Sequence, residues 1–256
     1  MTRELVFATY LAPSIRPVYE LVAQAAGEAL GRPTSLVTGR SFGQLTDGTV
    51  HFAFLCGLPY VRLSGCGLRA IAAPVLTGHR YGGRPIYFSD VIVPSTSSAQ
   101  GFGDLRGCSW AYNEPDSHSG YLVTLHHLLE MGETPAFFGR WKMTGYHQES
   151  VRRVAAGDLD ASAVDSQVLA VELRDHPELA GRIRVIDVLG PSTIQPLVAT
   201  AAASEALTRE VKSVVTSLDD PRLARGLVER FASVDDSSYA DIRSMLGAVE
   251  ALRATP

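Results

Sequence analysis

Short apolar runs rich in β-branched and aromatic residues alternate along the chain with helical patterns. Strands are predicted for a first set of runs at 5–10, 34–39, 51–57, 68–76 and 84–94, and for a second set at 108–112, 160–165, 182–190 and 194–200. Helices are predicted after the first strand, at about 119–131, about 148–156 and 166–173, and through the tail from residue 204 onward. This alternation is typical of βαβ units and predicts an α/β fold with largely parallel sheets.

Two such sets in one chain, with the last segments returning after the second set, predict two lobes. We expect residues 1–88 plus 190–256 to form lobe 1 and residues 89–189 to form lobe 2. The connecting segments near 88–91 and 187–190 would then be hinge strands. Because open α/β sheets bind ligands beyond the carboxyl ends of their strands, a central cleft between the lobes is the predicted site.

Composition narrows the class of protein. The 256 residues are 46% hydrophobic and 20% charged, with a formal net charge of −4, which is ordinary for a globular chain. No run of Lys and Arg is present, so no nucleic-acid surface is expected. No stretch approaches the roughly 20 apolar residues of a membrane span. Three cysteines without a C-x-x-C pair argue against a zinc site or a disulfide framework, although a Cys56–Cys66 bridge stays open.

The segment "NEPDSHSGY" at 113–121 carries the most distinctive chemistry. A strand ends before it and a helix starts near Ser119, so free helix amides and serine hydroxyls could gather around one oxyanion. Glu114 and Asp116 oppose an anion unless they point away, and Ser117 could simply cap the helix. A serine nucleophile is not supported, since "DSHSG" is not the G-x-S-x-G elbow.

A metal site on the predicted helix 119–131 is also weakly supported. His126 and Glu130 lie four residues apart and can share one face, but His127 points about 100° away from His126. The alternative is a solvated helix face with local ion pairs. We therefore predict no metal and no cofactor.

Further candidates follow predicted strands or precede predicted helices. His147 starts a helix, where it could face the cleft or be a satisfied core histidine, and Asp165 ends a strand, where it could bind a ligand or cap the next helix. Tyr10, Tyr87 and Ser41 are placed to line a cleft. Tyrosines at such positions are as often packed with a satisfied hydroxyl, and Ser41 could be a helix cap.

Four segments together resemble the substrate-binding proteins of phosphate, phosphite and phosphonate ABC importers. They read "GQLTDGTVHFAFLCGLPYV", "RPIYFSDVIV", "FGDLRGCSWAYNEPDSHSGYLV" and "GYHQESVRRVAAGDLDASAVDSQ", and the likeness spans roughly residues 2–199. The resemblance implies a type II periplasmic-binding-protein fold that closes about a hinge. It also implies a ligand-binding set that comprises Ser117, His118, Ser119, His147, Tyr87 and Asp165. Two departures are His118, where the family often has threonine, and "GPSTIQP", which offers no second acidic residue for an amine.

The resemblance implies a non-catalytic monomer that binds a small oxyanion and meets the permease of an ABC transporter, without inserting into the membrane. A periplasmic location is implied too. The amino end lacks the features of a secretory signal, so two alternatives stay open: a signal was removed, or the protein is cytoplasmic. Of three other functions on the same fold, two stay open and one is disfavoured. A lyase of the menaquinone-biosynthesis type could use the same fold, as could a cytoplasmic sensor, whereas the thiamine-type pyrimidine synthases carry a cysteine-rich motif that is missing here.

Overall fold

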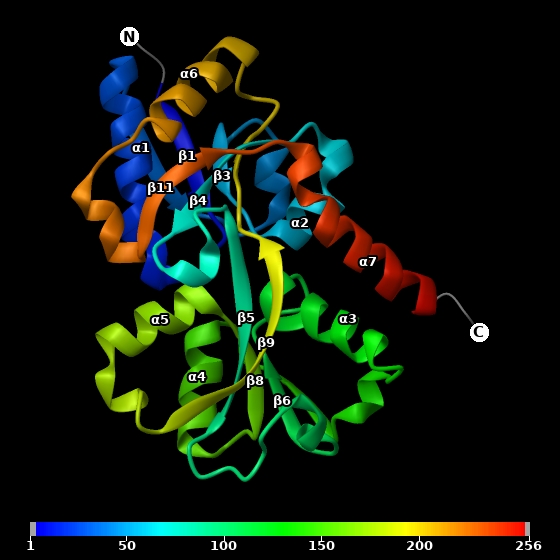
Figure 1. The fold of residues 1–256 in the computed structure, drawn as a ribbon. Helices are drawn as coiled ribbons and strands as arrows, with labels where there is room; N and C mark the ends of the chain where they lie inside the picture. The colour runs from blue at the N-terminus through cyan, green and yellow to red at the C-terminus, as the bar shows by residue number, and fades with distance from the viewer. Residues whose placement is uncertain (1–3, 254–256) are drawn as a thin grey trace. The chain divides into compact units, whose positions relative to one another are not determined.

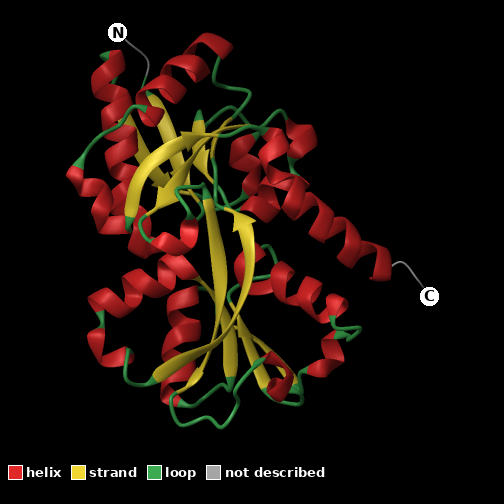
Figure 2. Cartoon of the chain, in the orientation of Figure 1, coloured by secondary structure: helices red, strands yellow, loops and turns green. Residues whose placement is uncertain are grey.

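The structure is a computed structural model, and it describes residues 4–253. The chain forms two compact units (Figures 1 and 2). Unit 1 comprises the chain up to Ile86 together with Thr193–Ala240, and unit 2 comprises Tyr87–Ser192 together with the chain from Asp241 onward. Each unit is built on one mixed β-sheet, so the predicted α/β class with two sheets is confirmed.

Unit 1 is a six-stranded sheet in the order β11-β4-β10-β3-β1-β2. Its elements are β1 (Leu5–Thr9), α1 (Arg16–Leu30), β2 (Thr34–Thr38), β3 (Phe52–Phe54), α2 (Gly57–Arg62), β4 (Arg69–Leu76), β10 (Leu197–Ala199), α6 (Glu205–Thr216) and β11 (Val228–Ser233). Strands β1, β2 and β3 run parallel, whereas β10 pairs antiparallel with both β3 and β4. The carboxyl ends of β1, β2 and β3 therefore share one edge of this sheet.

Unit 2 is a five-stranded sheet in the order β7-β6-β8-β5-β9. Its elements are β5 (Ile86–Pro94), β6 (Ser109–Tyr112), α3 (Val123–Glu130), β7 (Arg140–Met143), α4 (His147–Ala156), β8 (Ala161–Asp165), α5 (Ser166–Asp175), β9 (Ile183–Thr193) and α7 (Ala240–Arg253). Strand β6 runs parallel to β7 and β8, and β5 runs antiparallel to β8. The chain passes between the units in β5, in β9 and at the start of α7.

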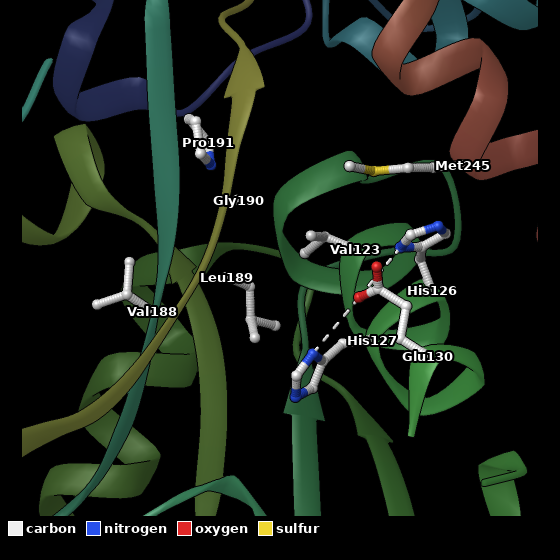
Figure 3. A pocket seen from close by; sticks show the side chains of 9 residues that line it. All are labelled: Val123, His126, His127, Glu130, Val188, Leu189, Gly190, Pro191 and Met245. Carbon is white, nitrogen blue, oxygen red and sulfur yellow. Dashed lines mark ion pairs between the residues drawn. The ribbon is translucent and has the colours of Figure 1, made fainter. Parts of the chain in front are cut away.

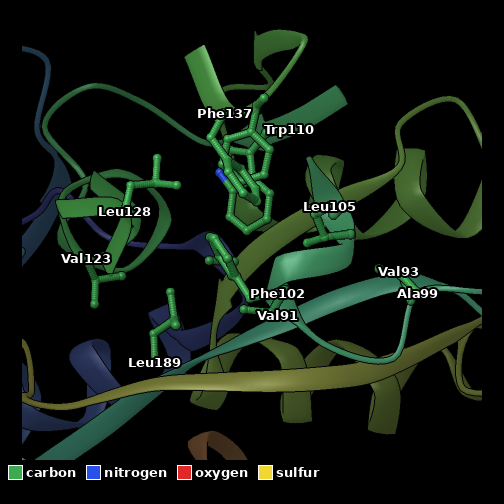
Figure 4. Packing of buried hydrophobic residues seen from close by; sticks show 13 residues of the cluster. Val91, Val93, Ala99, Phe102, Leu105, Trp110, Val123, Leu128, Phe137 and Leu189 are labelled. Carbon is green, nitrogen blue, oxygen red and sulfur yellow. The ribbon is translucent and has the colours of Figure 1, made fainter. Parts of the chain in front are cut away.

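The core of unit 2 follows directly from the period-two pattern of its strands. Val91 and Val93 face one side of the sheet and pack with Trp110 and Phe102, whereas Ile92 faces the other side. Figure 4 shows the first of these clusters, in which Phe102, Trp110 and Phe137 gather beside Val123 and Leu128 of α3. Both faces are buried, because α3 covers one and α4 and α5 cover the other (Figure 1).

Three details differ from the sequence prediction. Both sheets are mixed, because β10 and β11 pair antiparallel with β4 in unit 1 and β5 pairs antiparallel with β8 in unit 2. The tail after residue 204 is not helical throughout, since it contains β11 between α6 and α7. The unit boundaries fall at 86/87 and 192/193, not at 88/89 and 189/190, and α7 joins unit 2 although residues 190–256 were assigned to lobe 1. Helical periodicity shows that a helix has an apolar face, but not which core that face joins.

Candidate functional site

The helix that follows β6 starts with a serine cap, as one of the two sequence interpretations proposed. Ser117 is extended, and its Oγ accepts a hydrogen bond from the amide of Gly120 at 3.0 Å. The first turn, His118–Leu122, is π-helical and leads into α3. Single π-turns are frequent at functional sites. We call residues 117–120 the helix start.

His147 is held against the helix start by a side-chain hydrogen bond. It is the first residue of α4, and its Nε2 lies 2.9 Å from Ser119 Oγ. Both side chains are buried, and Nδ1 of His147 is buried without a hydrogen-bond partner in the described residues. Burial lowers the pKa of His147 to about 4. The imidazole is therefore neutral at neutral pH and acts through hydrogen bonds, not through charge.

His118 is turned toward the strands that lead out of unit 2. Its Nε2 lies 2.8 Å from Ser192 Oγ of β9, and its ring centroid lies 6.2 Å from that of Tyr87 in β5. The side chain is fully buried. Burial lowers the pKa of His118 to about 4, partly opposed by the charge of Asp241 and reinforced by His126.

Gly120 allows a close approach that no larger residue permits. A Cβ at this position would lie 2.0 Å from Asn113 Oδ1 and 3.1 Å from His147 Cε1. Asn113 Oδ1 is buried and has no hydrogen-bond partner in the part of the chain that the structure describes. The helix start is thus packed between the end of β6 and the start of α4.

The carboxylates near the site have different environments. Asp165 is buried, and its Oδ1 accepts hydrogen bonds from the amides of Gln167 and Val168, so the helix-cap interpretation of Asp165 is confirmed. Burial raises the pKa of Glu114, and the charge of Asp116 adds to the rise. Both effects favour the neutral form of Glu114 over the charged form.

The two candidates in unit 1 contact each other. The Tyr10 hydroxyl donates a hydrogen bond to the Ser41 carbonyl oxygen at 2.9 Å, at the carboxyl edge of β1 and β2. Burial raises the pKa of Tyr10, and the charge of Asp47 adds to it. The Tyr10 ring lies 5.3 Å from Phe42, and Ser41 is exposed at the N-cap of a 3-10 turn, Phe42–Leu45.

A separate cavity of about 220 Å³ lies in unit 2 between α3, β9 and α7 (Figure 3). It is lined by Val123, His126, His127, Glu130, Val188, Leu189, Gly190, Pro191 and Met245. Nδ1 of His126 and Nδ1 of His127 lie 3.6 and 3.8 Å from Glu130 Oε2, which are local contacts on one helix. In residues 4–253, no group of three or more His, Cys, Asp or Glu side chains is placed to hold a metal ion.

Six of the eight candidates thus fall in unit 2. At the helix start, Ser117 accepts the Gly120 amide and Ser119 is hydrogen-bonded to His147. Whether any of the eight touches a ligand stays a prediction. Sequence reasoning missed Ser192 and Asn113. Asn113 stands in the singled-out segment and carried the available signal, a polar residue just after a buried strand. Ser192 lies in a Gly-Pro-Ser-Thr run that resembles an ordinary loop and is 74 residues from His118.

The three cysteines are free, so no Cys56–Cys66 bridge forms, and Cys66 is exposed. No helix among the described residues is both long enough and apolar enough to cross a membrane.

Comparison with known proteins gives consistent results. Residues 6–239 match the family described as "ABC transporter, phosphonate, periplasmic substrate-binding protein". A probable ABC transporter phosphite-binding protein, PhnD1 of Prochlorococcus marinus (strain MIT 9301), is 23% identical over 163 residues, which are 59% of this chain and 55% of that protein. The match therefore spans about half the length of that curated relative.

Two solved structures share the fold. PhnD1 from Prochlorococcus marinus (MIT 9301) in complex with methylphosphonate has a TM-score of 0.83 at 16% identity, with 96% of this chain and 98% of that chain covered. A binding protein component of an ABC phosphonate transporter from Pseudomonas aeruginosa has a TM-score of 0.82 at 16% identity, with 98% and 87% covered. The predicted fold is confirmed by both. Since the family match covers most of the chain, the protein belongs to the periplasmic substrate-binding proteins of phosphonate ABC transporters.

Proposed function

We propose that this protein binds a small phosphorus oxyanion, namely a phosphonate, phosphite or phosphate, and delivers it to the permease of an ABC importer. The observation that carries the proposal is the helix start, where Ser117, Ser119 and His147 bring buried polar groups to the amino end of a helix. Family membership supplies the transporter context. The protein would work as a carrier in the periplasm, and no bond of the ligand would be broken.

The donors at the helix start suit an oxyanion. Ser117 Oγ already accepts the Gly120 amide hydrogen, so the Ser117 hydroxyl hydrogen is available to a ligand. The first amides of the helix have no intrahelical acceptor and lie at the positive end of the helix dipole. Hydroxyl and amide donors of this kind hold phosphate-like groups without a formal positive charge.

The histidine contact supports the same proposal. His147 fixes the position of Ser119 Oγ, because the hydrogen bond between them is buried and both side chains are packed. A donor that is fixed before binding loses little conformational entropy when the ligand arrives. The neutral imidazole of His147 carries one N–H. When its Nε2–H donates to Ser119 Oγ, the Ser119 hydroxyl hydrogen is available to the ligand and Nδ1 is an acceptor; in the other tautomer Ser119 donates to Nε2 and Nδ1–H is the donor.

The test is isothermal titration of methylphosphonate, phosphite, phosphate and sulfate into the wild type and into a double variant, Ser117→Ala with Ser119→Ala. Charge-assisted hydrogen bonds contribute about 1.5–3 kcal/mol each, so the double variant should bind at least about a hundredfold more weakly. Ser204→Ala is the matched control, because Ser204 Oγ also caps a helix amide, that of Leu207, but in unit 1. Unchanged affinity in the double variant would remove the helix start from the site.

Two further measurements address the carrier role. Phosphorus NMR of the ligand after prolonged incubation should show no new species, and any turnover would favour an enzyme. The predicted closing of the two lobes about their connections stays a prediction. Small-angle scattering with and without methylphosphonate tests it, and compaction is the expected result.

A further inference from the structure

His118 contacts the places where the chain leaves unit 2. Tyr87 is the first residue of unit 2 after one connection, and Ser192 is the last before the second. His118 Nε2 lies 2.8 Å from Ser192 Oγ, and its ring lies 6.2 Å from the Tyr87 ring. Asp241, the first residue after the third connection, is close enough to influence the protonation of His118.

The same residue belongs to the helix start. His118 directly follows the cap residue Ser117 and precedes Ser119, so its backbone is part of the turn proposed to hold the oxyanion. Its side chain is fully buried, and Ser192 is buried as well. A buried hydrogen bond is costly to break without a replacement partner, because water cannot satisfy the separated groups. The backbone at the helix start and the end of β9 are therefore held together.

We propose that His118 is a positioning residue that couples oxyanion binding at the helix start to the chain connections of unit 2 through its hydrogen bond with Ser192. This inference rests on the proposed function, since it needs a ligand at residues 117–120. It assigns the imidazole of His118 to the connections and leaves ligand contact to the serines, the amides and His147. A ligand that shifts or tightens the helix start then alters the end of β9 by the same contact.

The matched control is the next residue along the chain. Thr193 also makes a hydroxyl hydrogen bond, but its partly buried Oγ1 donates to the carbonyl oxygen of Ser238 in unit 1 at 2.7 Å. Ser192→Ala and Thr193→Ala each remove one hydroxyl hydrogen bond from the same connection. Only the first removes the contact with His118.

The experiment is hydrogen–deuterium exchange of the full chain with and without saturating methylphosphonate, read at residues 117–122 and 186–194. In the wild type and in Thr193→Ala, the ligand should slow exchange in both segments. In Ser192→Ala, protection of 117–122 should remain while the ligand effect on 186–194 is lost, with affinity about fivefold weaker, the equivalent of about 1 kcal/mol for one hydrogen bond. Ser192→Gly removes the same hydroxyl and replaces Ser192→Ala if that variant fails to fold.

Each other outcome overturns the inference. If the ligand slows exchange at 186–194 as much in Ser192→Ala as in the wild type, the hydrogen bond carries no coupling. Loss of protection at 117–122 in that variant shows that Ser192 contacts the ligand itself. If Thr193→Ala loses the ligand effect on 186–194 as fully as Ser192→Ala does, the effect belongs to the connection in general and not to the contact with His118. If the wild type shows no protection at 117–122, the proposed function fails first, and that result is distinct from the other three.

Discussion

Two of the buried histidines, His118 and His147, predict a specific loss of stability in mild acid. Burial holds the pKa of His118 and of His147 at about 4, against an ordinary value of 6.5. Between these two values the unfolded chain binds protons that the folded protein excludes. The contribution of these two neutral histidines to the free energy of unfolding is therefore fully present above pH 6.5 and is lost as the pH falls toward 4.

The size of the effect follows from the two pKa values. Between pH 8 and pH 5, a histidine that titrates at 6.5 when unfolded and at about 4 when folded lowers the free energy of unfolding by about 2 kcal/mol. Two such histidines remove about 4 kcal/mol together. This is a large part of the 5–15 kcal/mol that stabilises a typical domain.

The assay is urea unfolding of the ligand-free protein at pH 8, 6.5 and 5, for the wild type and for His147→Gln and His118→Gln. Carboxylates titrate in all three proteins, so the difference between their pH profiles isolates one histidine. Each variant should lose about 2 kcal/mol less than the wild type between pH 8 and pH 5. A variant that loses as much stability as the wild type would refute the assignment of its histidine as a buried neutral group.

Three more substitutions test the packing around the site. Gly120→Ala would place a methyl 2.0 Å from Asn113 Oδ1 and 3.1 Å from His147 Cε1, so the affinity for methylphosphonate, measured by titration, should fall at least about tenfold. Gly103→Ala is the control and should have no effect, because a Cβ there meets nothing within 4 Å. Arg152→Ala leaves the buried Glu172 carboxylate without its 2.7 Å partner and should lower the free energy of unfolding by about 2 kcal/mol. In the control Arg153→Ala, the partner Glu149 is partly exposed, so the cost should be less than about 1 kcal/mol. Equal costs of the two variants in urea unfolding would contradict the role of burial. Trp110→Ala removes a fully buried ring stacked 4.4 Å from Phe138 and should cost about 3–5 kcal/mol, and a smaller cost would show that the core refills the cavity.

Strands with both faces buried were readable from the sequence, whereas two of the four edge strands were not. β4 is buried from Ala70 to Leu76, so its apolar run is continuous. β7 and β11, which were missed, form the edges of the two sheets. The exposed positions of β7 include Arg140 and Lys142, and Glu229 and Arg230 are adjacent exposed residues in β11. Polar residues at an edge break the apolar alternation on which strand prediction depends.

The site was predictable where its contacts are local. The cap formed by Ser117 spans three residues, and the cap formed by Asp165 spans two or three, so each is visible as a short pattern. The contact of Ser119 with His147 spans 28 residues. It exists because β6 continues into the helix start and β7 leads into α4, and these two strands are parallel neighbours. Residue patterns suggest such a contact only after the strand order is known.

The polar groups described at the helix start are hydroxyls, amides and neutral imidazoles, and this composition has a consequence for selectivity. Neutral donors hold an anion well only when they are already oriented, since otherwise they exchange hydrogen bonds with water at little gain. Burial of Ser119 and His147 supplies this orientation. A ligand whose oxygen atoms or protons do not match the fixed donors leaves buried polar atoms unpaired, at about 1–3 kcal/mol each. Discrimination among tetrahedral oxyanions should therefore follow their pattern of donors and acceptors more closely than their net charge, and sulfate, which has no proton to offer at neutral pH, is the sharpest comparison with hydrogen phosphonates.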